Sequence, residues 1–200
     1  MMRTGTLSLL AVLLLVSCNN NSTTSTAEKR EAKGGVKYGG VFRYNEVEYL
    51  KTLYPQGVTE VTGHRITNQI YEGLVGFNQK DLTIEPMLAK SWDVDSTATV
   101  YTFHLRTGVV FHDDPCFADG KGRVMTAKDF VYCFNLLCTP DAKNQGFSFY
   151  RDIIKGFNEL YTAREKKQHD ADEAGALGVK AIDDSTLQIT LVKPYADFLN

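Results

Sequence analysis

The chain has 200 residues, with 22 basic and 24 acidic side chains and a formal net charge of −2. A nucleic-acid-binding surface needs a concentration of positive charge, so this balance argues against a nucleic-acid partner. The sequence contains no internal repeat, and its low-complexity content is confined to a polar stretch near the N-terminus.

Residues 1–17 are typical of a secretory signal peptide. Arg3 supplies the basic start, and the apolar run from Leu7 to Val16 is too short to span a bilayer, which takes about 20 residues. The run ends in Leu15-Val16-Ser17-Cys18, which resembles the bacterial lipobox. That resemblance implies that Cys18 is acylated and becomes the new N-terminus. The alternative is an ordinary signal peptide cleaved nearby, with Cys18 incidental.

Residues 18–38 predict a flexible tether. The stretch NNNSTTSTAEKREAKGG has no apolar side chain larger than Ala27, so it cannot bury enough surface to offset its chain entropy. We therefore expect a globular body held away from a membrane by this tether and anchored by lipid, with no protein span. Loss of Arg3 with the signal peptide gives the mature chain a net charge of −3.

The folded part is expected to start at residue 39. Residues 41–45 predict a strand and Pro55–Gly57 a turn. Residues 63–72 predict a helix, because apolar side chains recur every four residues at Ile66, Ile70 and Leu74. Residues 86–92 predict a short turn or helix.

Residues 101–111 predict a β-hairpin with one buried face. Apolar and polar side chains alternate along YTFHLR, Thr107-Gly108 forms the turn, and VVF returns. The buried face then carries Tyr101, Phe103 and Leu105.

The same region gathers residue types that bind transition metals, namely His104, His112, Asp113, Asp114 and Cys116. His104 falls on the polar face of the predicted strand, and His112 lies at the far end of the returning strand, beside a long loop. A single histidine on a solvated strand is more often solvated than a ligand. We therefore expect solvated side chains here, with no metal and no cofactor.

Two helices and a second hairpin follow. Thr126 reads as an N-cap with Asp129 at the third helical position, and the apolar stripe that follows, ended by Pro140, consists of Phe130, Phe134 and Leu137. Residues 150–166 predict another helix, whose inward side chains are Ile153, Ile154, Phe157 and Leu160. Residues 166–178 read as a solvated connector, and residues 179–191 as a hairpin that turns at Asp183-Asp184.

Three cysteines, Cys116, Cys133 and Cys138, remain after the signal peptide. Export permits disulfides, but Cys133 and Cys138 lie five apart on a predicted helix, which is poor geometry for a bridge. A bridge from Cys116 to either of them is the better candidate. The alternative is buried free thiols that behave as small apolar groups.

These elements mix strands and helices without a regular βαβ rhythm, which favours an α+β fold or a mixed sheet. The chain contains no GxSxG, HExxH, Walker or GxGxxG motif, and no nucleophile has a plausible base nearby. The residues therefore give no indication of an enzyme.

Three stretches resemble the family 5 extracellular solute-binding proteins, which are the peptide and nickel receptors of ABC importers. They are IYEGLVGF with IEPMLAKSWDVD (70–95), YTFHLRTGVVFHD with TAKDFVYCF (101–134), and GVKAIDDSTLQITLVKPYADFL (178–199). Their order and spacing follow the family from Gly39 onward. The sequence departs from the family pattern in the longer loop DDPCFADGKGR and in Leu53-Tyr54-Pro55, where the family has Leu-Asp-Pro.

The resemblance implies a periplasmic-binding-protein-like class II fold with two lobes, of which this chain would hold only the first part. The chain is much shorter than family members, and Ala196, Phe198 and Leu199 begin an apolar segment without a stop signal. We therefore interpret it as an N-terminal portion. The implied division is 39–62 for the first part of domain I, 63–177 for domain II, and 178–200 for an incomplete return into domain I.

The resemblance further implies a monomeric lipid-anchored receptor in the cell envelope, periplasmic or outside the cytoplasmic membrane. It would close around a peptide and dock on an ABC permease. The implied ligand contacts are the backbones of Thr59 and Val61 in the loop after the first strand, with Phe147 as a weaker aromatic candidate. The alternatives are a nickel, haem or sugar ligand in the same family, and a truncated envelope lipoprotein that binds no solute.

Overall fold

The computed structural model describes residues 30–31, 35, 37–167 and 177–199. The predicted signal peptide, the predicted lipid site at Cys18 and most of the predicted tether lie outside the described residues. Within the tether, the strands β1 (Arg30–Glu31) and β2 (Lys37–Tyr38) form a short antiparallel pair. The chain divides into two compact units, the first ending at Glu46 and the second beginning at Val47.

The strand predicted at 41–45 is wrong. These residues have no regular structure, and Val41 and Phe42 are 70% and 88% exposed. The sequence has the composition of a strand, but no described segment supplies the neighbouring backbone with which a strand must pair.

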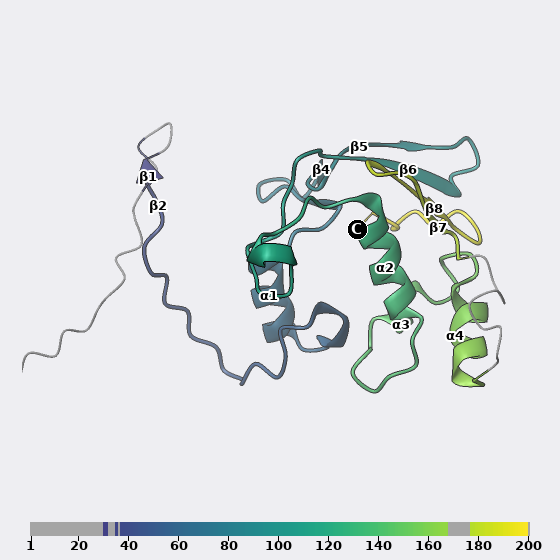
Figure 1. Cartoon of the computed structure of the whole chain (residues 1–200), viewed down its shortest axis with the longest axis horizontal. Helices are drawn as coiled ribbons and strands as arrows, with labels where there is room; N and C mark the ends of the chain where they lie inside the picture. The colour runs from purple at the N-terminus through teal and green to yellow at the C-terminus, as the bar shows by residue number, and fades with distance from the viewer. Residues whose placement is uncertain (1–29, 32–34, 36, 168–176, 200) are drawn as a thin grey trace, which may run out of the picture. The chain divides into compact units, whose positions relative to one another are not determined.

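The second unit is built around a four-stranded antiparallel sheet (Figure 1). Its strands are, in spatial order, β5 (Ala89–Val94), β6 (Val100–Leu105), β8 (Thr186–Thr190) and β7 (Val179–Asp183). The hairpin predicted at 179–191 is confirmed as β7 and β8, which pair directly. The first and last parts of the chain segment 89–190 therefore meet in one sheet.

The other predicted hairpin is wrong in its partner. Strand β6 pairs with β5 before it and with β8, and it does not pair with VVF after it. Residues predicted as a turn or helix at 86–92 instead form the end of β4 and most of β5. The turn between β5 and β6 is stabilised by Asp95, whose carboxylate accepts the N–H groups of Thr99 and Val100, each at 2.8 Å.

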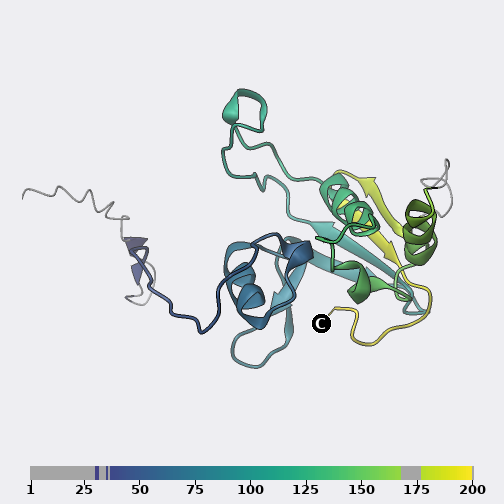
Figure 2. The same cartoon turned by 90° about the horizontal axis from the view of Figure 1, so that it is seen from below.

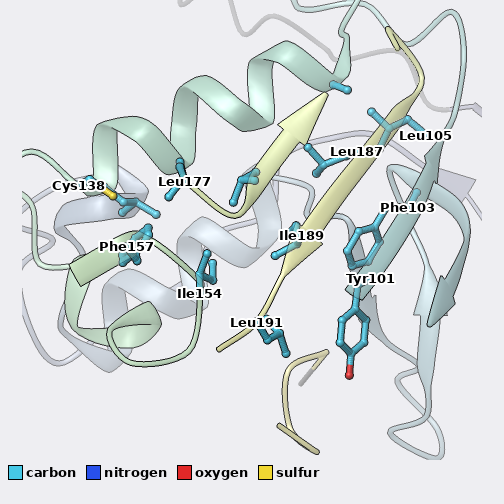
Figure 3. Close-up of a cluster of buried hydrophobic side chains, with 14 of the residues drawn as sticks. Tyr101, Phe103, Leu105, Cys138, Ile154, Phe157, Leu177, Leu187, Ile189 and Leu191 are labelled. Carbon is cyan, nitrogen blue, oxygen red and sulfur yellow. The ribbon is translucent and has the colours of Figure 1, made fainter. Parts of the chain in front are cut away.

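The apolar face of the sheet forms the core, as the alternating pattern predicts. Figure 3 shows Tyr101, Phe103 and Leu105 along β6 beside Leu187 and Ile189 of β8. Phe103, Leu105, Leu187 and Ile189 are each no more than 2% exposed. Burial of such side chains contributes about 1.5–3 kcal/mol each to folding.

Helix α2 (Ala127–Leu137) covers this face together with α4 (Phe157–Glu165) (Figure 1). The predicted start of α2 is confirmed as a capping box, in which the Thr126 N–H donates to the Asp129 carboxylate at 2.8 Å. The helix predicted at 150–166 is confirmed only over Phe157–Glu165, which form α4. Tyr150 instead ends the short α3 (Phe147–Tyr150), and Gly156 adopts a left-handed backbone (φ 76°) immediately before α4.

A smaller part of the second unit precedes the sheet. It consists of the 3-10 turn η1 (Pro55–Gly57), helix α1 (Val61–Ile70) and a hairpin of β3 (Val75–Phe77) with β4 (Ile84–Pro86). Helix α1 begins two residues earlier than predicted. Its buried residues are the small Thr62, Gly63 and Thr67, whereas Ile70, expected on the apolar face, is 54% exposed.

Two further segments of the second unit lie differently with respect to its core. Phe198 is not left without a packing partner, because its ring lies 4.8 Å from that of Tyr101 and it packs with Leu199 against the core. The long loop between Val110 and Val124, which carries the 3-10 turn η2 (Ala118–Gly120), projects from the sheet and helices in Figure 2. Phe198 and Leu199 are therefore half-buried against the core, whereas the loop projects away from it.

Candidate functional site

Thr59 and Val61, the two predicted backbone contacts, lie on either side of Glu60 at the start of α1. The backbone of Glu60 is extended (φ −93°, ψ 146°). In an extended segment, the carbonyl of one residue and the N–H two residues later point to the same side. The Thr59 carbonyl and the Val61 N–H therefore form an acceptor and donor pair that faces one direction.

Both residues lie on the surface. Thr59 is exposed and Val61 is 67% exposed. Within the residues that the structure describes, neither the Thr59 carbonyl nor the Val61 N–H has a hydrogen-bond partner. The Val61 N–H is one of the first N–H groups of a helix, which have no acceptor inside the helix. The pair can therefore bind the main chain of another extended segment.

Val58 keeps this segment in place. It is 2% exposed, and Gly63 allows it to pack closely, because a Cβ at Gly63 would lie 2.7 Å from Val58 Cγ1. With the Val58 side chain directed inward, the next residue, Thr59, faces outward. The orientation of the loop thus follows from one buried valine and one glycine on the first turn of α1.

A charged pair borders the same loop. Lys51 Nζ lies 2.5 Å from Glu60 Oε1, and the side chain of Glu60 is 21% exposed. The hydrogen bond to Glu60 raises the pKa of Lys51, and the same bond lowers the pKa of Glu60. Both groups are therefore charged at neutral pH, and the pair adds no net charge beside Thr59.

The third predicted contact, Phe147, is the first residue of α3 and is half-buried. Its ring stacks on those of Phe157 (centroids 5.3 Å apart) and Tyr161 (3.8 Å). Tyr150, one turn further along, packs against the same Phe157 ring, and burial raises the pKa of its hydroxyl. Phe147 is therefore held in an aromatic cluster, in which it also packs against the core.

The structure brings the two predicted regions together through backbone bonds. The Gln56 carbonyl accepts the N–H groups of Gln145 (2.8 Å) and Gly146 (3.0 Å), and Gly146 directly precedes Phe147. The Gln56 side chain donates to the Cys133 carbonyl on α2 at 3.3 Å. Residues 55–57 and 145–146, which are almost 90 positions apart in the chain, are thus neighbours.

Sequence reasoning missed three residues of this junction. Gln56 and Gly57 were predicted only as part of a turn, and Asn144 was not considered. Asn144 Nδ2 donates to three carbonyls at the end of α2, those of Leu136, Leu137 and Thr139. Asparagine and glycine are common turn residues, so the sequence could indicate a turn at each place but not the contact between the two turns.

The histidines do not gather ligands for a metal. His104 Nε2 lies 2.7 Å from Asp93 Oδ2 on the polar face of the sheet, and His112 is exposed in the long loop. Among the described residues, no group of three or more His, Cys, Asp or Glu side chains could hold a metal ion.

The three described cysteines are free, so the candidate bridge from Cys116 to Cys133 or Cys138 is wrong. Cys138 is buried at the end of α2, and burial raises the pKa of its thiol to about 12. Cys116 and Cys133 are exposed, contrary to the alternative of buried thiols. Only Cys138 therefore behaves as a small apolar core residue.

Comparison with known proteins places this geometry in context. Residues 83–200, more than half of the chain, match the family described as bacterial extracellular solute-binding proteins, family 5 Middle. No helix within the described ranges has the length and apolar character needed to cross a membrane.

Several proteins of known name or structure are similar to this chain in sequence or fold. Heme-binding protein A of Haemophilus influenzae is 31% identical over 94% of this chain and 32% of its own length. The periplasmic oligopeptide-binding protein OppA of Escherichia coli is 33% identical over 77% of this chain and 25% of its own. The structure of Listeria monocytogenes OppA bound to peptide superposes with a TM-score of 0.62 at 27% identity, over 76% of this chain and 26% of that one. The chain thus spans about a third or less of the length of these proteins.

Proposed function

Because the chain belongs to the family 5 bacterial extracellular solute-binding proteins, we propose that it is part of a receptor that binds peptides for an ABC importer. The proposed ligand contacts are the backbones of Thr59 and Val61, with the ring of Phe147 as a weaker contact. Binding and release of a solute need no bond to be made or broken, so the proposed role is not enzymatic.

The observation that carries this proposal is the accessible pair formed by the Thr59 carbonyl and the Val61 N–H. A bound peptide can add to this pair as a further strand, through its own main-chain N–H and C=O groups. Main-chain recognition is independent of the peptide's side chains. Water-filled side-chain pockets would then let one site accept many sequences.

We propose that the described part supplies one side of a cleft. In the domain division expected from the resemblance, residues 63–177 form domain II, and residues 39–62 and 178–200 belong to domain I. A two-lobed receptor closes by a hinge motion that the ligand favours through contacts made only in the closed form. Thr59 and Val61 lie at the boundary between the two proposed domains, where both can face the ligand.

A second candidate ligand is haem. The similarity to Heme-binding protein A of H. influenzae extends over 94% of this chain, further than the similarity to E. coli OppA. Under this alternative the ligand has no peptide main chain, and the Thr59 and Val61 pair would contribute little. Nickel and sugar ligands, and a lipoprotein that binds no solute, are not favoured by a particular contact in the described residues.

We propose that the protein functions in the cell envelope as a monomer, anchored by lipid at Cys18 and held by the tether 18–38. The signal-peptide pattern and the lipobox-like LVSC sequence support this location. The proposed partner is the membrane permease of the importer, to which the closed receptor delivers its ligand.

The test is a native mass spectrum of the protein extracted from its own membranes. Acyl groups together with a spread of peptide-sized adducts would support both the anchor and the peptide ligand. A single haem-sized or metal adduct would favour the alternative ligand. An acylated protein without any adduct, which also fails to bind added peptides, would contradict a role in solute uptake.

A further inference from the structure

Three side chains donate to carbonyls near the C-terminal end of α2: Gln56 to Cys133, Arg164 to Asn135, and Asn144 to the carbonyls that follow. The last carbonyl groups of a helix have no N–H partner within the helix and need donors from elsewhere. Asn144 Nδ2 provides them, at 3.2 Å from the Leu136 carbonyl, 2.8 Å from that of Leu137 and 2.9 Å from that of Thr139. Asn144 thereby attaches the loop 141–146 to the end of α2.

The next two residues of this loop hold η1. The N–H groups of Gln145 and Gly146 both donate to the Gln56 carbonyl, at 2.8 and 3.0 Å. A loop bonded to α2 through Asn144 is therefore bonded to η1 through the adjoining backbone. Three residues beyond Gln56 the chain reaches Thr59.

Two glycines show how closely these segments approach each other. A Cβ at Gly57 would lie 2.7 Å from the Lys143 carbonyl oxygen, and a Cβ at Gly146 would lie 2.5 Å from Leu137 Cδ2. At either distance, an added Cβ would force the neighbouring atoms to move. The junction thus has close packing at both glycines as well as hydrogen bonds.

We infer that Asn144 is a positioning residue for residues 58–61, the proposed ligand-contact loop. Its hydrogen bonds hold the loop 141–146 against α2. That loop in turn holds η1, and the position of η1 sets where Thr59 and Val61 lie relative to α2. Asn144 itself touches no ligand in this arrangement. The consequence for affinity rests on the proposed peptide-binding function, whereas the mechanical link between Asn144 and residues 55–61 does not.

The chemistry of the site requires a neutral donor. Three carbonyl oxygens converge on Nδ2, so a carboxylate in its place would face three acceptors and repel them. Asn144 Oδ1 is buried without a partner among the described residues. All the hydrogen bonds of this side chain among the described residues are therefore made by its amide nitrogen.

The experiment compares three variants of the full chain by amide hydrogen exchange and by peptide binding. Asn144→Ala removes the donor, and Gly57→Ala separates the two loops by a different route. Asn135→Ala is the matched control, since its side-chain oxygen accepts Arg164 Nη2 at 2.8 Å, on the α4 side of the same helix.

Both junction variants should increase exchange of the amides of Gly57 and Val58, which are hydrogen-bonded within residues 55–61, about tenfold, because local opening becomes easier. The core amides of β6 and β8 should exchange as in the unmodified protein, and Asn135→Ala should leave residues 55–61 unchanged. A mixed-sequence tetrapeptide pool should bind the junction variants about tenfold more weakly at a temperature where all are folded.

Unchanged exchange at 55–61 in both junction variants would overturn the inference, as would an equal change in Asn135→Ala. Unchanged peptide affinity despite faster exchange would also overturn a positioning role. If the unmodified protein binds no peptide from the pool while the exchange pattern appears as expected, the proposed function fails and the mechanical link stands. The two failures are therefore distinguishable.

Discussion

Val61 allows main-chain recognition to be tested by a single substitution. Val61→Pro removes the N–H that we propose binds the ligand, and proline is accommodated at the first position of a helix. The preceding residue, Glu60, already has the extended backbone that a following proline requires. We expect peptide affinity to fall about fivefold, the value of one hydrogen bond of about 1 kcal/mol, without loss of thermal stability. Calorimetric titration with a peptide measures the affinity.

Val61→Ala is the matched control for this substitution. It removes the exposed side chain and keeps the N–H, so peptide affinity should remain within about twofold of the unmodified protein. If the alanine variant weakens binding as much as the proline variant does, the side chain and not the backbone is the contact.

Asp129 connects the cap of α2 to pH-dependent stability. Its carboxylate accepts the Thr126 N–H at 2.8 Å and pairs with Arg123, and the bond to Arg123 lowers the pKa of Asp129 from its ordinary value of 3.8. Because the folded-state pKa is depressed, the stabilisation is complete above the unfolded-state value and is lost as pH falls through the folded-state pKa. Asp129→Asn should therefore cost about 1 kcal/mol at neutral pH and progressively less in acid.

Denaturant unfolding at a series of pH values measures this effect. Asp184→Asn is the control, because its carboxylate lies 3.4 Å from Lys128 with both side chains more than 70% exposed. Exposed pairs contribute little to stability. A cost of Asp129→Asn that stays constant from neutral pH to strong acid would contradict the assigned role of the charge.

At the level of elements, the loop from Val110 to Val124 owes its closure to contacts at its base. The Phe111 N–H donates to the Arg123 carbonyl at 3.0 Å, and the Arg123 guanidinium lies 4.9 Å from the centre of the Phe111 ring. A Cβ at Gly122 would lie only 1.7 Å from the Phe111 carbonyl oxygen. The two arms of the loop can therefore stay paired only if residue 122 has no side chain.

Gly122→Ala should open this base. We expect a loss of about 1–3 kcal/mol in the free energy of unfolding, together with faster proteolytic cleavage within residues 111–123. Thermal unfolding and limited proteolysis measure the two effects. Gly120→Ala is the control, because its Cβ meets no atom within 4 Å and only the positive φ of 68° opposes it. Equal cleavage of the two variants would show that the base does not close the loop.

Helix α1 buries small residues, whereas its sequence predicts that its apolar side chains are buried. Its buried residues are Thr62, Gly63 and Thr67, and the Thr67 hydroxyl is satisfied by the Gly63 carbonyl at 3.0 Å. Small residues allow the close packing of Val58 against Gly63, which sets the outward direction of Thr59. Because small residues occupy the packed face of α1, the apolar side chains of Val61 and Ile70 are left exposed.

For the whole molecule, the proposed lipid anchor predicts where the protein resides. Cys18→Ser removes the thiol that would be acylated, so the protein should move from the membrane fraction into the aqueous phase. Cys116→Ser is the control, because Cys116 is an exposed free thiol in the folded part and its loss should not release the protein. Detergent-phase partitioning of cell fractions measures the result. Retention of Cys18→Ser in the membrane fraction would contradict lipid anchoring at this residue.

The sequence by itself determined the features that depend on neighbours along the chain. The alternation of Tyr101, Phe103 and Leu105 correctly indicated the buried face of β6, because side chains of a strand alternate whatever its partner. The Thr126 and Asp129 pair correctly indicated the start of α2, because a capping box spans only three residues. The motif series of residues 70–199 also identified the family.

Only the tertiary structure decided which segments meet. The segment after Thr107-Gly108 looked like the partner of β6. In the structure, β5 and β8 occupy the two edges of β6. The bonds from Gln145 and Gly146 to Gln56, and from Asn144 to the end of α2, join residues that no local pattern relates. Local periodicity states which face of an element is apolar. The choice of its neighbour depends on backbone hydrogen bonds and close packing between distant segments, which form only when the whole unit is folded.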